Sequence, residues 1–144
     1  MLITEVKASK IRRTRHRNLR QGKPFSTTTY KKDNDKKTFH LACIYNNIII
    51  SCATFYPENN SFFSKENAYR LRGMATDLEQ RKKGIGKKIM LHAFEKIKKK
   101  KGTLLWCNAR LVAVEFYKKL GLQIKGEEFN ITDIGPHYLM YKKM

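Results

Sequence analysis

The stretch RKKGIGKK, residues 81–88, places two glycines one residue apart among basic side chains, directly before an amphipathic run. Isoleucine or alanine then recurs every fourth residue from Ile85 to Ile97, which predicts a helix with one apolar face. The preceding run YRLRGMAT, residues 69–76, alternates as a strand does. A glycine loop between a strand and a helix brings backbone N–H groups to the positive end of the helix dipole, where anions bind. These residues therefore predict a strand–loop–helix unit that is suited to an anion.

Three phosphate-binding patterns can be compared with this loop. The dinucleotide fingerprint G-x-G-x-x-G needs a third glycine where the chain has Ile89. The Walker loop needs glycine and then serine or threonine at positions occupied by Arg81 and Lys88. The pattern R/Q-x-x-G-x-G/A is matched in full from Arg81 to Gly86. A six-residue pattern with three fixed positions by itself leaves two interpretations open, a cofactor loop or a structural turn before a helix.

The remaining segments predict an α+β (mixed α/β) fold in one domain, residues 1–144. The expected strands flank two helices, one of them in a strand–helix–strand crossover. The expected elements are a short strand in 1–10, a basic helix or substrate-side loop in 11–20, a hairpin of 38–45 and 48–56 around Asn46-Asn47, a strand in 103–107, a helix in 109–120, and two strands around a Gly-Pro turn in 122–144.

The charge of the chain is strongly positive, with 31 lysines and arginines against 12 acidic residues and a net charge of +19. Such a surface attracts polyanions, so a basic nucleic-acid- or ribosome-binding module without catalytic activity is an alternative function. Neither basic run contains interleaved aromatic residues, and no nucleic-acid-binding signature is present. A solvated lysine-rich face is the third interpretation. The residues that the binding module would use are Arg12, Arg13, Arg15, Arg17, Arg20 and Lys98–Lys101.

The cysteines and the hydropathy pattern bear on location and on metals. Cys43, Cys52 and Cys107 are far apart and odd in number, with no metal-ligand spacing, which favours a reducing, cytoplasmic compartment and predicts no metal. No histidine or aspartate is spaced to make Cys107 a nucleophile. We expect no membrane span and no secretory signal, because the apolar runs are short or interrupted by polar residues.

Several stretches beyond the glycine loop are similar to one family. ARLVAVEFYKKLGL, residues 109–122, resembles the segment N-x-x-A-x-x-L-Y-x-x-x-G-F of the GNAT N-acetyltransferase superfamily, although Arg110 and Leu122 replace the usual Asn and Phe. LRGMAT, WCNAR and GPHYLMYK, with RHRNLRQGKP and FHLACIY earlier, resemble a small bacterial branch often labelled ElaA-like. The resemblance implies a central, mostly antiparallel twisted sheet of about six or seven strands flanked by helices. It also implies acetyl-CoA as co-substrate, and dimers are common in the family, so a homodimer is possible by analogy.

The resemblance assigns roles to individual residues. The end of a strand at Met74, Ala75 and Thr76 would offer main-chain groups to the pantetheine arm and the acetyl carbonyl, and Asn108 would lie where the pantetheine emerges. Tyr117 would protonate the departing thiolate, whereas periodicity alone favours a core aromatic residue. The loop would hold the pyrophosphate, mostly through N–H groups, with Arg81, Lys82, Lys83, Gly84, Ile85 and Gly86.

Transfer of an acetyl group from a thioester to an amine requires alignment, a polarised carbonyl and removal of a proton. A lysine-like amine has a pKa of about 10, so a base or a water chain must accept that proton. His40, Glu66 and His137 are the candidate bases. The sequence leaves the acceptor open among small amines, aminoglycoside-like molecules, peptides and protein lysines.

Overall fold

The computed structural model describes residues 1–144, and strands from both ends of the chain join one seven-stranded sheet. The spatial order of the strands is β1-β2-β3-β4-β5-β7-β6. The strands are β1 (Leu2–Val6), β2 (Phe39–Tyr45), β3 (Ile48–Pro57), β4 (Ala68–Thr76), β5 (Leu104–Arg110), β6 (Gln123–Ile131) and β7 (Gly135–Lys143). The α-helices are α1 (Arg12–Leu19), α2 (Ile85–Lys99) and α3 (Val114–Lys119).

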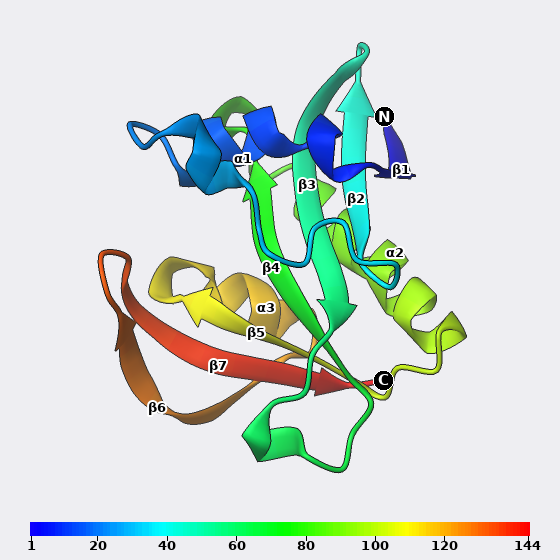
Figure 1. Cartoon of the computed structure of the whole chain (residues 1–144), viewed down its shortest axis with the longest axis vertical. Helices are drawn as coiled ribbons and strands as arrows, with labels where there is room; N and C mark the ends of the chain where they lie inside the picture. The colour runs from blue at the N-terminus through cyan, green and yellow to red at the C-terminus, as the bar shows by residue number, and fades with distance from the viewer.

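Every neighbouring pair of strands is antiparallel except β4 and β5, which are parallel and are connected through α2. Figure 1 shows α1 in front of the sheet, with α2 and α3 behind it. The predicted fold class, a mixed and mostly antiparallel sheet flanked by helices, is confirmed.

The strong local patterns produced the expected elements. Asn46 and Asn47 have φ of 51° and 63°, the left-handed backbone that a two-residue hairpin turn between β2 and β3 needs. The apolar face of α2 is buried against the sheet at Ile85, Ile89, Met90, Ala93, Phe94 and Ile97. None of the helices has the length and hydropathy of a membrane span.

The helix predicted over residues 109–120 is wrong at its start. Ala109 and Arg110 belong to β5, where they pair with Tyr138 and His137 of β7. A 3-10 turn at Leu111–Ala113 follows, and α3 begins only at Val114. Pairing with β7, which lies far along the chain, extended the strand beyond the limit that the local pattern suggested.

Candidate active site

The loop before α2 exposes backbone donors. Lys82 and Gly84 have φ of 63° and 78°, so two residues of the loop adopt the left-handed backbone. Gly84 is the N-cap of α2, no side chain caps this helix end, and its first turn contains no acidic residue. The N–H groups of the first turn are therefore free to bind an anion, and the helix dipole favours one there.

The second glycine of the loop is required by close packing. A Cβ atom added at Gly86 would lie 3.1 Å from Cζ of Phe116 and 3.3 Å from Cε of Met74. The loop therefore approaches both α3 and β4 closely. Arg81 ties the same loop to the end of β4, because its Nε donates a hydrogen bond of 2.9 Å to the Thr76 carbonyl.

β4 and β5 separate after a short paired segment. Their parallel pairing covers only residues 68–70 with 104–106. The register of β4 against β3 shifts between Cys52 and Thr54, so that Gly73 and Met74 lie opposite one residue of β3. Such a bulge bends the strand and interrupts its ladder. Figure 1 shows the two strands diverging, with α3 behind the opening.

A cavity of about 680 Å³ follows this opening. It extends from the glycine loop along β4 and β5 to α1, α3 and the β6–β7 turn. Lys83 is the one residue of the predicted loop that does not line it. The predicted site residues that do line it are Met74, Ala75, Thr76, Arg81, Lys82, Gly84, Ile85, Gly86, Asn108, Tyr117 and His137.

Tyr117 and Cys107 are buried side chains in the cavity wall. Burial raises the pKa of the Tyr117 phenol well above its ordinary value, with a further contribution from Cys107, so the phenol keeps its proton at neutral pH. Burial also raises the pKa of Cys107 to about 12. The Cys107 thiol is therefore not ionised and is a poor nucleophile.

The three candidate bases lie in different environments. His137 lines the cavity, and its Nδ1 lies 2.7 Å from the Gly135 carbonyl oxygen. A carbonyl only accepts, so Nδ1 carries the proton and Nε2 of the neutral ring has a free lone pair. Glu66 lies outside the cavity and accepts a hydrogen bond of 2.8 Å from the Thr103 hydroxyl.

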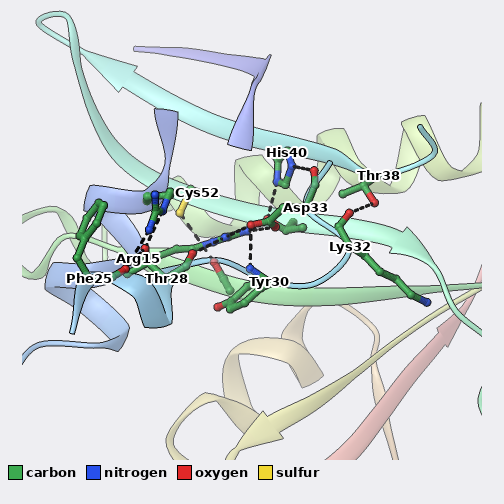
Figure 2. A network of polar contacts seen from close by, with 12 residues as sticks. Arg15, Phe25, Thr28, Tyr30, Lys32, Asp33, Thr38, His40 and Cys52 are labelled. Carbon is green, nitrogen blue, oxygen red and sulfur yellow. Dashed lines mark hydrogen bonds and ion pairs between the residues drawn. The ribbon is translucent and has the colours of Figure 1, made fainter. Parts of the chain in front are cut away.

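His40 belongs to a buried polar network instead (Figure 2). Its Nε2 lies 2.9 Å from the Asp33 carbonyl oxygen and its Nδ1 lies 2.8 Å from Thr54 Oγ1. Since the carbonyl needs a donor, Nε2 carries the proton and the Thr54 hydroxyl donates to Nδ1. Burial lowers the pKa of His40, although Asp33 opposes this shift, and the ring is neutral. His40 therefore belongs to this buried network and does not line the cavity.

The same network contains a fully buried arginine. Arg15 binds both carboxylate oxygens of Asp33, at 2.7 and 2.9 Å, and donates to Thr54 Oγ1 at 2.6 Å. Burial raises the pKa of Asp33, but the hydrogen bonds from Arg15 and from the Tyr30 N–H outweigh this and hold it below its ordinary value. Arg15 therefore cannot belong to the basic surface predicted for residues 11–20. Arg17 is also neutralised, by Asp77 at 2.7 Å.

Sequence reasoning missed two cavity residues at the end away from the glycine loop, Tyr30 and Arg72. Asn18, Leu19 and Arg20 line the same end, and they lie in the 11–20 segment for which the sequence offered a substrate-side loop as one interpretation. Figure 2 shows Tyr30 hydrogen-bonded through its backbone to Asp33. Alternation along β4 puts Arg70 and Arg72 on the same side of the strand, which was a usable signal. Nothing local marked Tyr30, because it reaches the cavity from a loop.

Comparison with known proteins decides the family. Residues 8–122 match the model of the acetyltransferase (GNAT) family. The chain belongs to the GNAT acetyltransferase family. It is 38% identical over 143 residues to the uncharacterized N-acetyltransferase YitI of Bacillus subtilis, in an alignment that spans 97% of this chain and 96% of YitI. The protein is thus an acetyl-CoA-dependent N-acetyltransferase, as the sequence predicted.

Solved structures agree on the GNAT fold. The chain resembles an aminoglycoside 6'-N-acetyltransferase complexed with coenzyme A, with a TM-score of 0.79 and 13% identity over 99% of this chain and 97% of that one. It also resembles Escherichia coli ElaA, with a TM-score of 0.78 and 14% identity over 99% of both chains. At these identities the likeness establishes the fold alone.

Proposed function

We propose that the protein transfers the acetyl group of acetyl-CoA directly to a primary amine, with Tyr117 as the acid that protonates the CoA thiolate. One observation carries the proposal. A single cavity joins the uncapped glycine loop, the diverging ends of β4 and β5, and the protonated Tyr117 phenol.

The residues of the loop suit the pyrophosphate. The N–H groups at the start of α2 would hold the phosphate oxygens, and Arg81 and Lys82 would add charge beside them. Gly86 lets the main chain lie close to Phe116 and Met74, which leaves no room for a side chain between them. Lys83 would contribute only through its charge at a distance, since its side chain lies outside the cavity.

The end of β4 suits the thioester. The bulge at Gly73 and Met74 interrupts the β3–β4 hydrogen-bond ladder there. Ser51 Oγ donates a hydrogen bond of 2.8 Å to the Ala75 carbonyl. A backbone N–H at Ala75 or Thr76 would polarise the acetyl carbonyl as negative charge develops on its oxygen. Asn108, on the opposite strand, would border the pantetheine arm.

The chemistry then needs two proton transfers. The amine attacks the carbonyl carbon, the carbon–sulfur bond breaks, and the thiolate takes the phenolic proton of Tyr117. His137 would accept the amine proton at Nε2, because Nδ1 is already committed to Gly135. An acyl-enzyme on Cys107 is disfavoured by the high pKa of that thiol.

The test replaces Tyr117 with phenylalanine. We expect Tyr117→Phe to lower kcat about 100-fold or more while the KM for acetyl-CoA stays unchanged, because only the proton donor is lost. The readout is release of free CoA with an amine panel. Tyr69→Phe is the matched control, since Tyr69 is a buried core tyrosine outside the cavity.

Acetyl-CoA should also raise the melting temperature of the wild-type protein, since a ligand that binds only the folded state stabilises it. An unchanged melting temperature would contradict the cofactor assignment. Equal kcat values for Tyr117→Phe and wild type would contradict the role of the phenol alone.

A further inference from the structure

The charged side chains of the active-site cavity wall are all of one sign, positive. No aspartate or glutamate lines it. Its lysines and arginines are Arg20, Arg70, Arg72, Arg81, Lys82, Lys87, Arg110 and Lys119. The residues of the glycine loop and of the first turn of α2 are explained by the phosphates of acetyl-CoA. The arginines away from that loop need a different explanation.

Three arginines in or near this region have a carboxylate partner. Arg15 binds Asp33 at 2.7 Å, Arg17 binds Asp77 at 2.7 Å, and Arg70 binds Glu58 at 2.8 Å. By contrast, four arginines of the cavity wall take part in no ion pair within the chain: Arg81, which belongs to the glycine loop, and Arg20, Arg72 and Arg110, which lie away from it.

Two of these unpaired arginines lie on one side of the sheet. Arg70 stacks over the Trp106 ring at 4.8 Å, so these two side chains share a face of β4 and β5. Arg72 follows Arg70 by two residues on β4, and Arg110 follows Trp106 by four residues on β5. Because side chains alternate along a strand, both arginines lie on that face as well. Leu71 and Cys107 point to the opposite face, into the main core. Arg72 and Arg110 thus come from the two strands that diverge.

Arg72 is held in place before any ligand binds. Its guanidinium lies 4.1 Å from the centroid of the Tyr30 ring, and Arg15 lies 3.9 Å from the same centroid. The backbone N–H of Tyr30 donates to Asp33 at 2.9 Å. A planar guanidinium stacked on a fixed ring presents its donors in a defined plane, as recognition of a carboxylate or phosphate requires.

Arg20 differs from the paired arginines in its terminal nitrogens. The Nε atoms of Arg15, Arg20 and Arg70 are all buried without a hydrogen bond, but Arg15 and Arg70 bind carboxylates through Nη atoms, whereas Arg20 takes part in no ion pair within the chain. A buried donor without a partner costs free energy, which an acceptor atom of a ligand would recover. Arg20 follows the last residue of α1, so this donor reaches the cavity from the helix side of the site.

We propose that the acceptor amine carries an anionic group, a carboxylate or a phosphate, that Arg20, Arg72 and Arg110 bind; this inference rests on the proposed function above. The same charges favour the reaction in a second way. A bound ammonium is repelled by the arginines, so its pKa falls and the neutral, nucleophilic amine is more populated. Polycationic amines find no carboxylate in the cavity and are disfavoured.

The experiment compares amines that differ only in the anion. The pairs are 5-aminopentanoate with pentylamine, and O-phosphoethanolamine with ethanolamine, assayed by CoA release at one pH. We expect the anionic member of at least one pair to have a kcat/KM about tenfold or more above its neutral partner, as a charge-assisted hydrogen bond would provide. The pair that shows the preference identifies the anion as carboxylate or phosphate.

The variants locate the effect. Arg72→Gln and Arg110→Gln should reduce the preference about tenfold through the KM of the anionic amine, with a smaller loss of rate on the neutral amine, whose ammonium form is then repelled less. Arg13→Gln is the matched control, because it removes one positive charge from an exposed position of α1 outside the cavity. If Arg13→Gln lowered the preference for the anionic amine equally, the preference would depend only on net charge, and the inference would be overturned.

A binding measurement keeps the inference separate from turnover. When CoA saturates the glycine loop, titration calorimetry with the anionic amines measures only their binding at the end of the cavity away from that loop. Binding that weakens about tenfold in Arg72→Gln supports the inference. Absence of binding, or equal turnover of both members of each pair in wild type, overturns it and leaves the acetyltransferase assignment intact. Failure of acetyl-CoA to bind at all overturns the proposed function itself.

Discussion

Two arginines stack on the Tyr30 ring, and their positive charges are compensated differently. Arg15 is fully buried and is paired with Asp33. Arg72 lines the cavity and takes no part in an ion pair within the chain. A charge without access to solvent must be compensated inside the protein, whereas a charge at a cavity can be compensated by a ligand. The difference separates an arginine that stabilises the fold from one that selects a substrate.

The strongest test of this difference is to remove each arginine. We expect Arg15→Met to lower the free energy of unfolding by about 3–5 kcal/mol, because Asp33 is left as an unpaired buried charge. Arg72→Met should cost only about 1 kcal/mol, the scale of its stacking on Tyr30. Urea denaturation measures both. The double variant Arg15→Met, Asp33→Asn should recover part of the loss, and equal losses in the two single variants would remove the distinction.

The shared ring can be removed next. Tyr30→Leu keeps an apolar side chain but deletes both arginine–ring contacts, so we expect a loss of about 1–3 kcal/mol in unfolding free energy. Arg72 would also lose its fixed position, which should raise the KM for the acceptor more than the KM for acetyl-CoA. Tyr45→Leu, at an exposed tyrosine on β2, is the control. A rise confined to the KM for acetyl-CoA would argue against the link.

Gly73 tests how closely β4 approaches the Tyr30 ring. Its φ is +65°, and an added Cβ would lie 3.0 Å from Cε2 and from the hydroxyl oxygen of Tyr30. Gly73→Ala should lose about 1–2 kcal/mol from backbone strain and lower kcat/KM for the acceptor by displacing the ring. Gly22→Ala is the matched control, because Gly22 has φ of +80° and open space around it. It should show the loss of stability without the loss of activity.

The smallest expected effect is the dependence of stability on acid. Burial lowers the pKa of His40, so below about pH 6.5 the unfolded chain binds a proton that the folded chain does not, and unfolding free energy falls. Asp33 has a pKa below its ordinary value despite burial, so its contribution is complete above about pH 3.9 and is lost as pH falls further.

Urea unfolding as a function of pH should therefore show two windows. His40→Asn should remove the upper window, and Arg72→Gln should leave both unchanged, since it lies outside the paired network. A single acid transition in wild type would contradict the assignment of a neutral His40.

Much of the fold was predictable because its signals are local. The apolar stripe of α2, the Asn-Asn hairpin turn and the strand before the glycine loop each follow from a few neighbouring residues. The end of β5 was not predictable in this way. Residues Ala109 and Arg110 resemble the start of a helix, and only pairing with β7 keeps them in the sheet.

The candidate site divides similarly. The loop from Arg81 to Gly86 could be found from its pattern, and the prediction for Tyr117 rests on the resemblance to the family. The candidate bases could not be ranked from sequence, because distance to the cavity depends on the whole sheet. His137 lines the cavity, whereas His40 and Glu66 are bonded elsewhere.

The sequence by itself determined the family, the glycine loop and the net positive charge, since these depend on residue types and short spacings. Only the tertiary structure decided which positive charges are paired with a carboxylate of the chain. Arg15 and Arg17 lie in one basic helix, yet their partners Asp33 and Asp77 come from distant segments. Arg72 is also an arginine, but it has no carboxylate partner within the chain. Charge compensation depends on distances in space, and those distances are set by the folding of the sheet around the cavity.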